Sequence, residues 1–115
     1  LSLPMNLKFL ETAQPGLRWF HRYYRENPQL RKPAALAAFR KARALIKTNP
    51  YIGHAYEGID TVREYTIQST NFSILYTFAR ETIWVIDIRD ARGLRSAEAL
   101  SHFAAELRGQ MRGEV

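Results

Sequence analysis

The chain has 115 residues, of which 46% are apolar and 24% charged, and it has no cysteine. This length suits one domain, and the composition is that of a chain that buries a core rather than of a disordered one. Missing cysteines exclude a disulfide framework, a thiolate nucleophile and a cysteine zinc site.

We expect one domain over residues 1–115, with 110–115 as a frayed tail. Met5 is a candidate natural start, which would place Leu1–Pro4 ahead of the domain, and the sequence leaves this open. No apolar run approaches the roughly 20 residues that span a bilayer, and the first residues lack a signal-peptide pattern. We therefore expect a cytoplasmic protein with no membrane partner.

The net charge of +6 is unevenly distributed. Arg18 to Lys47 holds nine basic residues and one acidic residue, Glu26, whereas Thr48–Val115 carries a net charge of −2. A concentrated positive field attracts polyanions or an acidic protein, although a solvated helix face explains the same charges equally well.

The first half of the chain predicts one strand and two helices. Asn6–Glu11 is a short apolar stretch typical of a strand, and Thr12–Pro15 marks a helix start because proline loses no hydrogen bond in the first turn. Asn27-Pro28 ends this helix, and the alanine-rich stretch Pro33–Thr48 predicts a second one, stopped by Asn49-Pro50. The two helices would form an antiparallel hairpin.

The first helix has more apolar surface than a core needs. One stripe at helical spacing is Leu17, Phe20 and Tyr24, and a second is Trp19 and Tyr23. We predict that Trp19, Tyr23 and the outward side of Phe39 are anchors for a partner protein. The alternative is that Trp19 packs under the C-terminal helix.

In the second half of the chain the apolar residues recur with a period of two, which is typical of strands. Tyr51–Asp60 is expected to be a loop, followed by three strands in a meander: Val62–Gln68, Phe72–Phe78 and the continuously apolar Thr82–Ile88. The last of these is expected to be central, and the first strand of the chain to pair along an edge of the meander.

A charged connector, Arg89–Arg95, leads to a last helix that Ser96 caps and that ends near Gly109. The predicted order is β-α-α-β-β-β-α. The fold class is therefore α+β, with a helical hairpin packed in two layers on a small, mainly antiparallel sheet.

Common catalytic motifs are absent: there is no phosphate-binding glycine loop, HExxH or GxSxG. Asp87 and Asp90 are expected to have a structural or salt-bridging role rather than to bind a metal. His21, His54 and His102 lack a nucleophile or ligand set at a recognisable spacing. We predict no metal and no organic cofactor.

Four arginines lie at strand ends, where side chains converge on a surface without disturbing the core. They are Arg63, Arg89, Arg92 and Arg95. Because a guanidinium binds phosphate and carboxylate bidentately, Arg89, Arg92 and Arg95 are predicted to contact a cellular target. Arg63 has an equal alternative, as a half-buried partner of Asp60, Asp87 or Asp90.

Phrases along nearly the whole chain resemble a known superfamily. They are Met5-Asn-Leu-Lys-Phe9, Tyr23-Tyr-Arg-Glu-Asn-Pro28, Leu45-Ile-Lys-Thr-Asn-Pro50, Val62-Arg-Glu-Tyr-Thr-Ile67, Phe72-Ser-Ile-Leu-Tyr76 and Ile83-Trp-Val-Ile-Asp-Ile-Arg89. In this order and spacing they are similar to RelE/ParE toxins of bacterial type II toxin–antitoxin modules. The resemblance implies a small toxin, neutralised by an antitoxin whose C-terminal segment wraps across the hairpin and sheet, and operator DNA contacted only through that antitoxin.

The resemblance is closer to the ParE branch, whose members poison DNA gyrase. RelE-like members cut ribosome-bound mRNA with basic residues on the sheet and a tyrosine on the C-terminal helix. At the corresponding positions this chain has Glu64, Thr66, Ser73, and Ala99 or Leu100, which leaves Arg92 as a counterpart. The chain also departs from the ParE branch: it lacks the basic phrase with which ParE-like chains leave their last strand, and has Asp87-Ile-Arg-Asp-Ala-Arg-Gly93 instead.

The leading hypothesis is thus a ParE-like toxin that acts by binding, with gyrase as the expected target. The competing hypothesis is a ribosome-dependent endoribonuclease that uses Arg63, Arg92 and His102. A third is an inactive relative that serves as co-repressor with its antitoxin.

Overall fold

A computed structural model describes residues 4–92 of the chain. The predicted C-terminal helix, Arg95 and His102 lie outside the described residues. The elements, in chain order, are β1 (Asn6–Phe9), a 3-10 turn (Glu11–Ala13), α1 (Gln14–Glu26), a second 3-10 turn (Pro28–Leu30), α2 (Lys32–Thr48), a third 3-10 turn (Pro50–Ile52), β2 (His54–Tyr56), β3 (Ile59–Thr66), β4 (Phe72–Ala79) and β5 (Thr82–Asp90).

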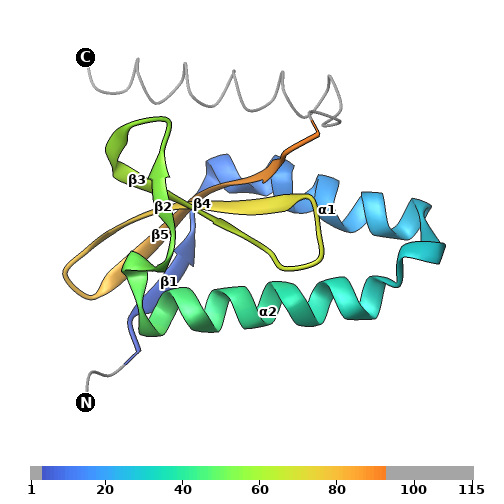
Figure 1. Cartoon of the computed structure of the whole chain (residues 1–115), viewed down its shortest axis with the longest axis horizontal. Helices are drawn as coiled ribbons and strands as arrows, with labels where there is room; N and C mark the ends of the chain where they lie inside the picture. Colours follow the sequence, from blue (N-terminus) through green and yellow to red (C-terminus); the bar gives the residue numbers. More distant parts are fainter. Residues whose placement is uncertain (1–3, 93–115) are drawn as a thin grey trace.

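The strands form one sheet in the order β1-β5-β4-β3-β2. β1 pairs with β5 in parallel, and the other neighbours are antiparallel. Figure 1 shows α1 and α2 running in opposite directions from a connection at one end of the molecule. The predicted α+β class, the hairpin, the position of β5 inside the sheet and the pairing of β1 along the meander are all confirmed.

The core lies between the helices and one face of the sheet. The Phe20 ring of α1 is about the same distance from three other rings, with centroid separations of 5.1 Å to Tyr24, 5.1 Å to Phe39 and 5.0 Å to Phe72. Tyr76 on β4 is completely buried beside them. This aromatic core packs both helices against the sheet. Neither helix in the described part of the chain is long and apolar enough to cross a membrane.

The prediction of a loop over Tyr51–Asp60 is wrong, because this stretch holds the third 3-10 turn and β2, and β3 begins at Ile59. Glu57 and Gly58 both adopt positive φ and make the tight turn between β2 and β3. A strand of three residues with a bulge between Ala55 and Tyr56 is too short to show a period of two. β1 is also shorter than predicted, and β5 extends to Asp90.

The register of β4 against β5 decides which residues face the helices. Phe72 pairs with Asp90, and cross-strand partners point to the same face of a sheet. Because the Phe72 ring packs on α1, Asp90 also faces α1. Ser73 pairs with Arg89 one residue along, so this pair lies on the outer face, away from the helices.

Candidate functional site

At the end of β5, an ion pair fastens the strand to α1. The Asp90 side chain is 0% exposed and that of Arg92 24% exposed. Arg92 donates from Nε to Asp90 Oδ1 at 2.9 Å and from Nη2 to Oδ2 at 3.0 Å, which is bidentate geometry. Trp19 Nε1 on α1 donates to Oδ2 at 2.9 Å. We call Trp19, Tyr23, Asp90 and Arg92 the Asp90 cluster.

The cluster also fixes the Arg92 guanidinium over an aromatic ring. Arg92 donates to the Tyr23 hydroxyl, and its guanidinium carbon lies 4.1 Å from the centre of the Tyr23 ring. Burial by itself raises the pKa of Asp90, but the hydrogen bonds that Arg92 and Trp19 donate outweigh it, so this pKa lies below its ordinary value. Burial by itself lowers the pKa of Arg92, but the hydrogen bonds to Asp90 and Tyr23 outweigh it, so this pKa lies above its ordinary value. Both groups are therefore charged at neutral pH.

The prediction that Asp90 forms a salt bridge is confirmed. Its partner is Arg92, which the sequence suggested as a contact for a cellular target and which is half-buried here. Arg92 lies in the turn after β5, as the sequence placed it, and its side chain folds back onto the buried Asp90 carboxylate two residues away, which needs a cation as its partner. Trp19 and Tyr23 remain half-buried, with their polar atoms used inside the chain. Their role as antitoxin anchors stays a prediction that rests on the parts of the rings left exposed.

Arg63 on β3 binds neutral groups. Its Nη1 donates to the carbonyl of Gly53 and, at 3.4 Å, to that of Tyr51, and its guanidinium carbon lies 5.2 Å from the centre of the Tyr51 ring. The suggested pairing of Arg63 with Asp90 is wrong, because Arg92 occupies that carboxylate. Arg63 holds a turn.

That turn, Pro50–Gly53, is braced from the sheet side as well, and we call it the Tyr51 turn. The buried hydroxyl of Tyr76 donates to the Pro50 carbonyl at 2.6 Å and accepts from the Gly53 N–H at 3.0 Å. Burial raises the pKa of Tyr76, so the hydroxyl keeps its proton and remains a donor. A Cβ on Gly53 would lie 2.8 Å from that hydroxyl and 2.8 Å from the Glu64 carbonyl oxygen, so only glycine fits.

The outer face of the sheet holds a second ion pair. Arg89 Nη1 is 3.1 Å from Glu64 Oε2, and His54 Nε2 is 3.4 Å from Glu64 Oε1. The hydroxyls of Thr66 and Ser73 lie 3.4 Å apart on neighbouring strands of the same face. The predicted grouping of Arg63 with Arg89 does not form, because the alternation of β3 puts Arg63 and Glu64 on opposite faces.

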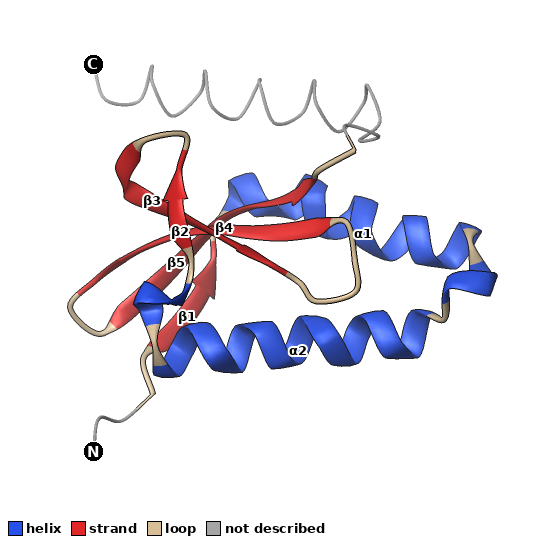
Figure 2. Cartoon of the chain, viewed as in Figure 1, coloured by secondary structure: helices blue, strands red, loops and turns tan. Residues whose placement is uncertain are grey.

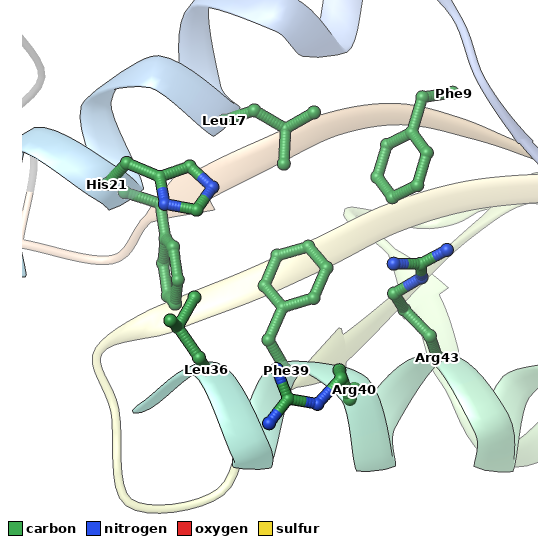
Figure 3. A pocket seen from close by; sticks show the side chains of 8 residues that line it. Phe9, Leu17, His21, Leu36, Phe39, Arg40 and Arg43 are labelled. Atoms are coloured by element: carbon green, nitrogen blue, oxygen red, sulfur yellow. The ribbon is translucent and has the colours of Figure 1, made fainter. Parts of the chain in front are cut away.

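Between α1 and α2 lies a hollow of about 280 Å³ with an apolar floor and a basic rim. Figure 3 shows Phe9 from β1, Leu17 from α1 and Phe39 from α2 around it. The rim residues are His21, Arg40 and Arg43, and Arg43 lies 5.1 Å from the centre of the Phe9 ring. Burial, and then Lys32, lowers the pKa of His21, which is therefore neutral at pH 7.

Phe39 contributes less surface than the sequence suggested. It is only 6% exposed, and it belongs to the core while also lining the hollow. Arg40 and Arg43, by contrast, belong to the charges that the sequence also allows on a solvent-exposed face of the helix. Their spacing of three residues puts both on the side of α2 that faces the hollow, which is the signal that could have singled them out.

The architecture, with a basic helical hairpin on a mostly antiparallel five-stranded sheet, is that of the RelE/ParE-like toxins. A scan against protein-family models matches the ParE toxin of the type II toxin–antitoxin system, parDE, over residues 7–94. The chain belongs to this family, and membership implies an antitoxin partner. A search of curated proteins finds no match to the chain.

Proposed function

We propose that this toxin inhibits growth by binding DNA gyrase, that it does not cut RNA, and that its cognate antitoxin neutralises it by covering the hollow between α1 and α2. The observation that carries the choice of binding over cleavage is the outer face of the sheet. There Glu64 holds Arg89 in an ion pair, and the neighbouring groups are the hydroxyls of Thr66 and Ser73.

Metal-free cleavage of RNA needs donors aimed at the charge that builds up on the phosphate. Each such donor contributes about 2–4 kcal/mol of transition-state stabilisation. A carboxylate at the Glu64 position repels a phosphate instead, and the pairing of Arg89 with Glu64 offsets the charge that Arg89 could offer. This face therefore favours a protein that binds over one that cleaves RNA.

The hollow supports the proposed antitoxin contact. Its floor of aromatic and aliphatic side chains suits the apolar anchors of an amphipathic segment, and its Arg40 and Arg43 rim suits acidic residues beside those anchors. The surrounding hairpin is the strongly basic part of the chain, which would speed the approach of an acidic partner.

Expression of the chain without an antitoxin tests the proposed target. Growth should stop, DNA breaks that depend on gyrase should appear, and transcripts should stay intact. Rapid cleavage of transcripts at ordered positions would instead establish a RelE-like nuclease. Normal growth would favour an inactive relative that works as co-repressor.

Co-purification with the cognate antitoxin tests the hollow. Reversing both rim charges, with Arg40→Glu and Arg43→Glu, should abolish co-purification. The matched control reverses two exposed charges outside the hollow, with Arg25→Glu and Lys41→Glu, and should retain the antitoxin. Trp19→Ala tests the predicted anchor separately. It should weaken co-purification, and an unchanged yield would show that Trp19 is not part of the antitoxin-binding surface.

A further inference from the structure

The Tyr51 turn presents an exposed aromatic ring. Tyr51 is 66% exposed, more than the other large exposed apolar residues of the described part of the chain, Leu30 at 43% and Ile59 at 47%. Its ring packs edge-on against Phe78, with centroids 5.0 Å apart, and lies beside the Arg63 guanidinium. A ring in water costs free energy that a partner can recover by burying it.

Hydrogen bonds on several sides hold the turn, and with it the backbone of Tyr51, in one conformation. The Tyr76 hydroxyl holds both ends of the turn, Arg63 binds two of its carbonyls, and the Asn49 side chain accepts from the Tyr51 N–H at 3.2 Å. These hydrogen bonds therefore hold in place a segment whose main exposed side chain is Tyr51. A ring that is already fixed loses little conformational entropy when it binds, which is what an interface anchor requires.

The charge beside the ring indicates the kind of partner. Arg63 binds two carbonyls and the face of a ring, all of which are neutral, so its positive charge stays with the turn. Tyr and Arg are, with Trp, the residue types enriched among the few residues that carry most of the binding energy of a protein interface. The complementary surface is an apolar recess with a carboxylate at its edge.

We propose that Tyr51 is the aromatic anchor with which this toxin binds an acidic protein surface on its cellular target, with Arg63 bracing the turn and supplying the complementary charge. The inference rests on the proposed function, since it assigns a contact to the proposed target. Figure 2 shows the Tyr51 turn at the end of α2 that lies away from the connection to α1. No residue of this turn lines the hollow proposed for the antitoxin, so the anchor is a separate surface.

Binding of the purified toxin to purified gyrase tests the anchor. Tyr51→Ala should weaken binding about 30-fold, the loss typical of an interface anchor. Tyr51→Phe should bind like the wild type, because it keeps the ring. Leu30→Ala, which removes another exposed apolar side chain at the opposite end of α2, is the matched control and should bind normally. Binding should also weaken as salt is raised, because a charge pair contributes.

Folding and antitoxin capture separate the anchor from a structural role. Tyr51→Ala should keep its urea midpoint close to that of the wild type and should still co-purify with the antitoxin. If Tyr51→Ala binds gyrase as tightly as the wild type, the anchor is overturned while the proposed function stands. If the wild type itself does not bind gyrase, the proposed function fails and the anchor fails with it.

A single-stranded DNA oligonucleotide checks the assignment to a protein surface, because bases also stack on aromatic rings. The wild type and Tyr51→Ala should bind it equally weakly. Binding by the wild type that is lost in Tyr51→Ala would overturn the protein partner in favour of a nucleic acid.

Discussion

The Asp90 cluster and the Tyr51 turn each depend on one arginine, and the two arginines have different roles. Arg92 lies just after the end of β5, and Arg63 lies within β3. Arg92 meets a buried carboxylate, so its charge is offset inside the molecule and it ties β5 to α1. Arg63 meets carbonyl oxygens and a ring, so it fixes a turn and keeps its charge available. The comparison teaches that an arginine's role follows from its partners rather than from its position at a strand end.

The partners also predict different responses to mutation. Removing an arginine that neutralises a buried carboxylate leaves an unpaired charge in a region that water does not reach, which is costly. Removing groups from the Tyr51 turn leaves neutral atoms unsatisfied or crowded, which costs less. The predictions below test this difference, starting with the largest effect.

Arg92→Ala should lower the free energy of unfolding by about 3–5 kcal/mol, because it leaves the buried Asp90 without its cation. Urea denaturation at neutral pH measures the loss. Arg89→Ala is the control. Arg89 and Glu64 are 39% and 12% exposed, against 24% and 0% for Arg92 and Asp90, so breaking this pair should cost less, about 1 kcal/mol. Equal small losses in the two variants would show that the Asp90 cluster is not structural.

Gly53→Ala should cost about 2 kcal/mol, since the added methyl group would force apart the Glu64 backbone and the Tyr76 hydroxyl. Gly58→Ala is the matched control. Gly58 has a φ of +76° but open space around it, so its substitution should cost only about 1 kcal/mol of backbone strain. Thermal unfolding of both variants gives the comparison, and a larger loss at Gly58 would contradict a crowded Tyr51 turn.

Acid should weaken the Asp90 cluster selectively. The pKa of Asp90 is lower in the folded chain than in the unfolded chain, so the unfolded chain takes up this proton first. The stability that the carboxylate contributes is therefore present at neutral pH and is lost as the pH falls from about 4 towards the folded pKa. Between pH 5 and pH 3, wild-type stability should fall more steeply than that of Asp90→Asn, and parallel curves would contradict this.

Glu64→Gln should have the smallest effect, about 0.5–1 kcal/mol, because Arg89 is 39% exposed and water can solvate its guanidinium once the carboxylate is gone. A double-mutant cycle with Arg89→Ala measures the coupling, and 0.5 M salt should reduce it. A coupling as large as that of the Asp90 cluster would mean that the outer face is as shielded from water as the helix side.

Helices and long strands were predictable because each carries a complete local pattern. Proline in the first turn of α1, the alanine-rich α2 and the apolar β5 all act within a few residues of each other. β2 was missed because three residues with a bulge have no measurable period. Of the two stripes of α1, Phe20 and Tyr24 are in the core, as predicted. Trp19 and Tyr23 are half-buried and pack against that core, so much of the second stripe is used inside the chain.

The sequence by itself determined the fold class, the basic hairpin and the resemblance to RelE/ParE toxins, because these depend on periodicity, composition and the order of elements. Only the tertiary structure decided that Asp90 binds Arg92, that Arg63 braces the Tyr51 turn and that Arg40 and Arg43 border a hollow. The physical reason is that such contacts depend on strand register and helix rotation. A shift of one residue along a strand moves a side chain to the other face, and the pattern of one segment does not report what lies opposite it.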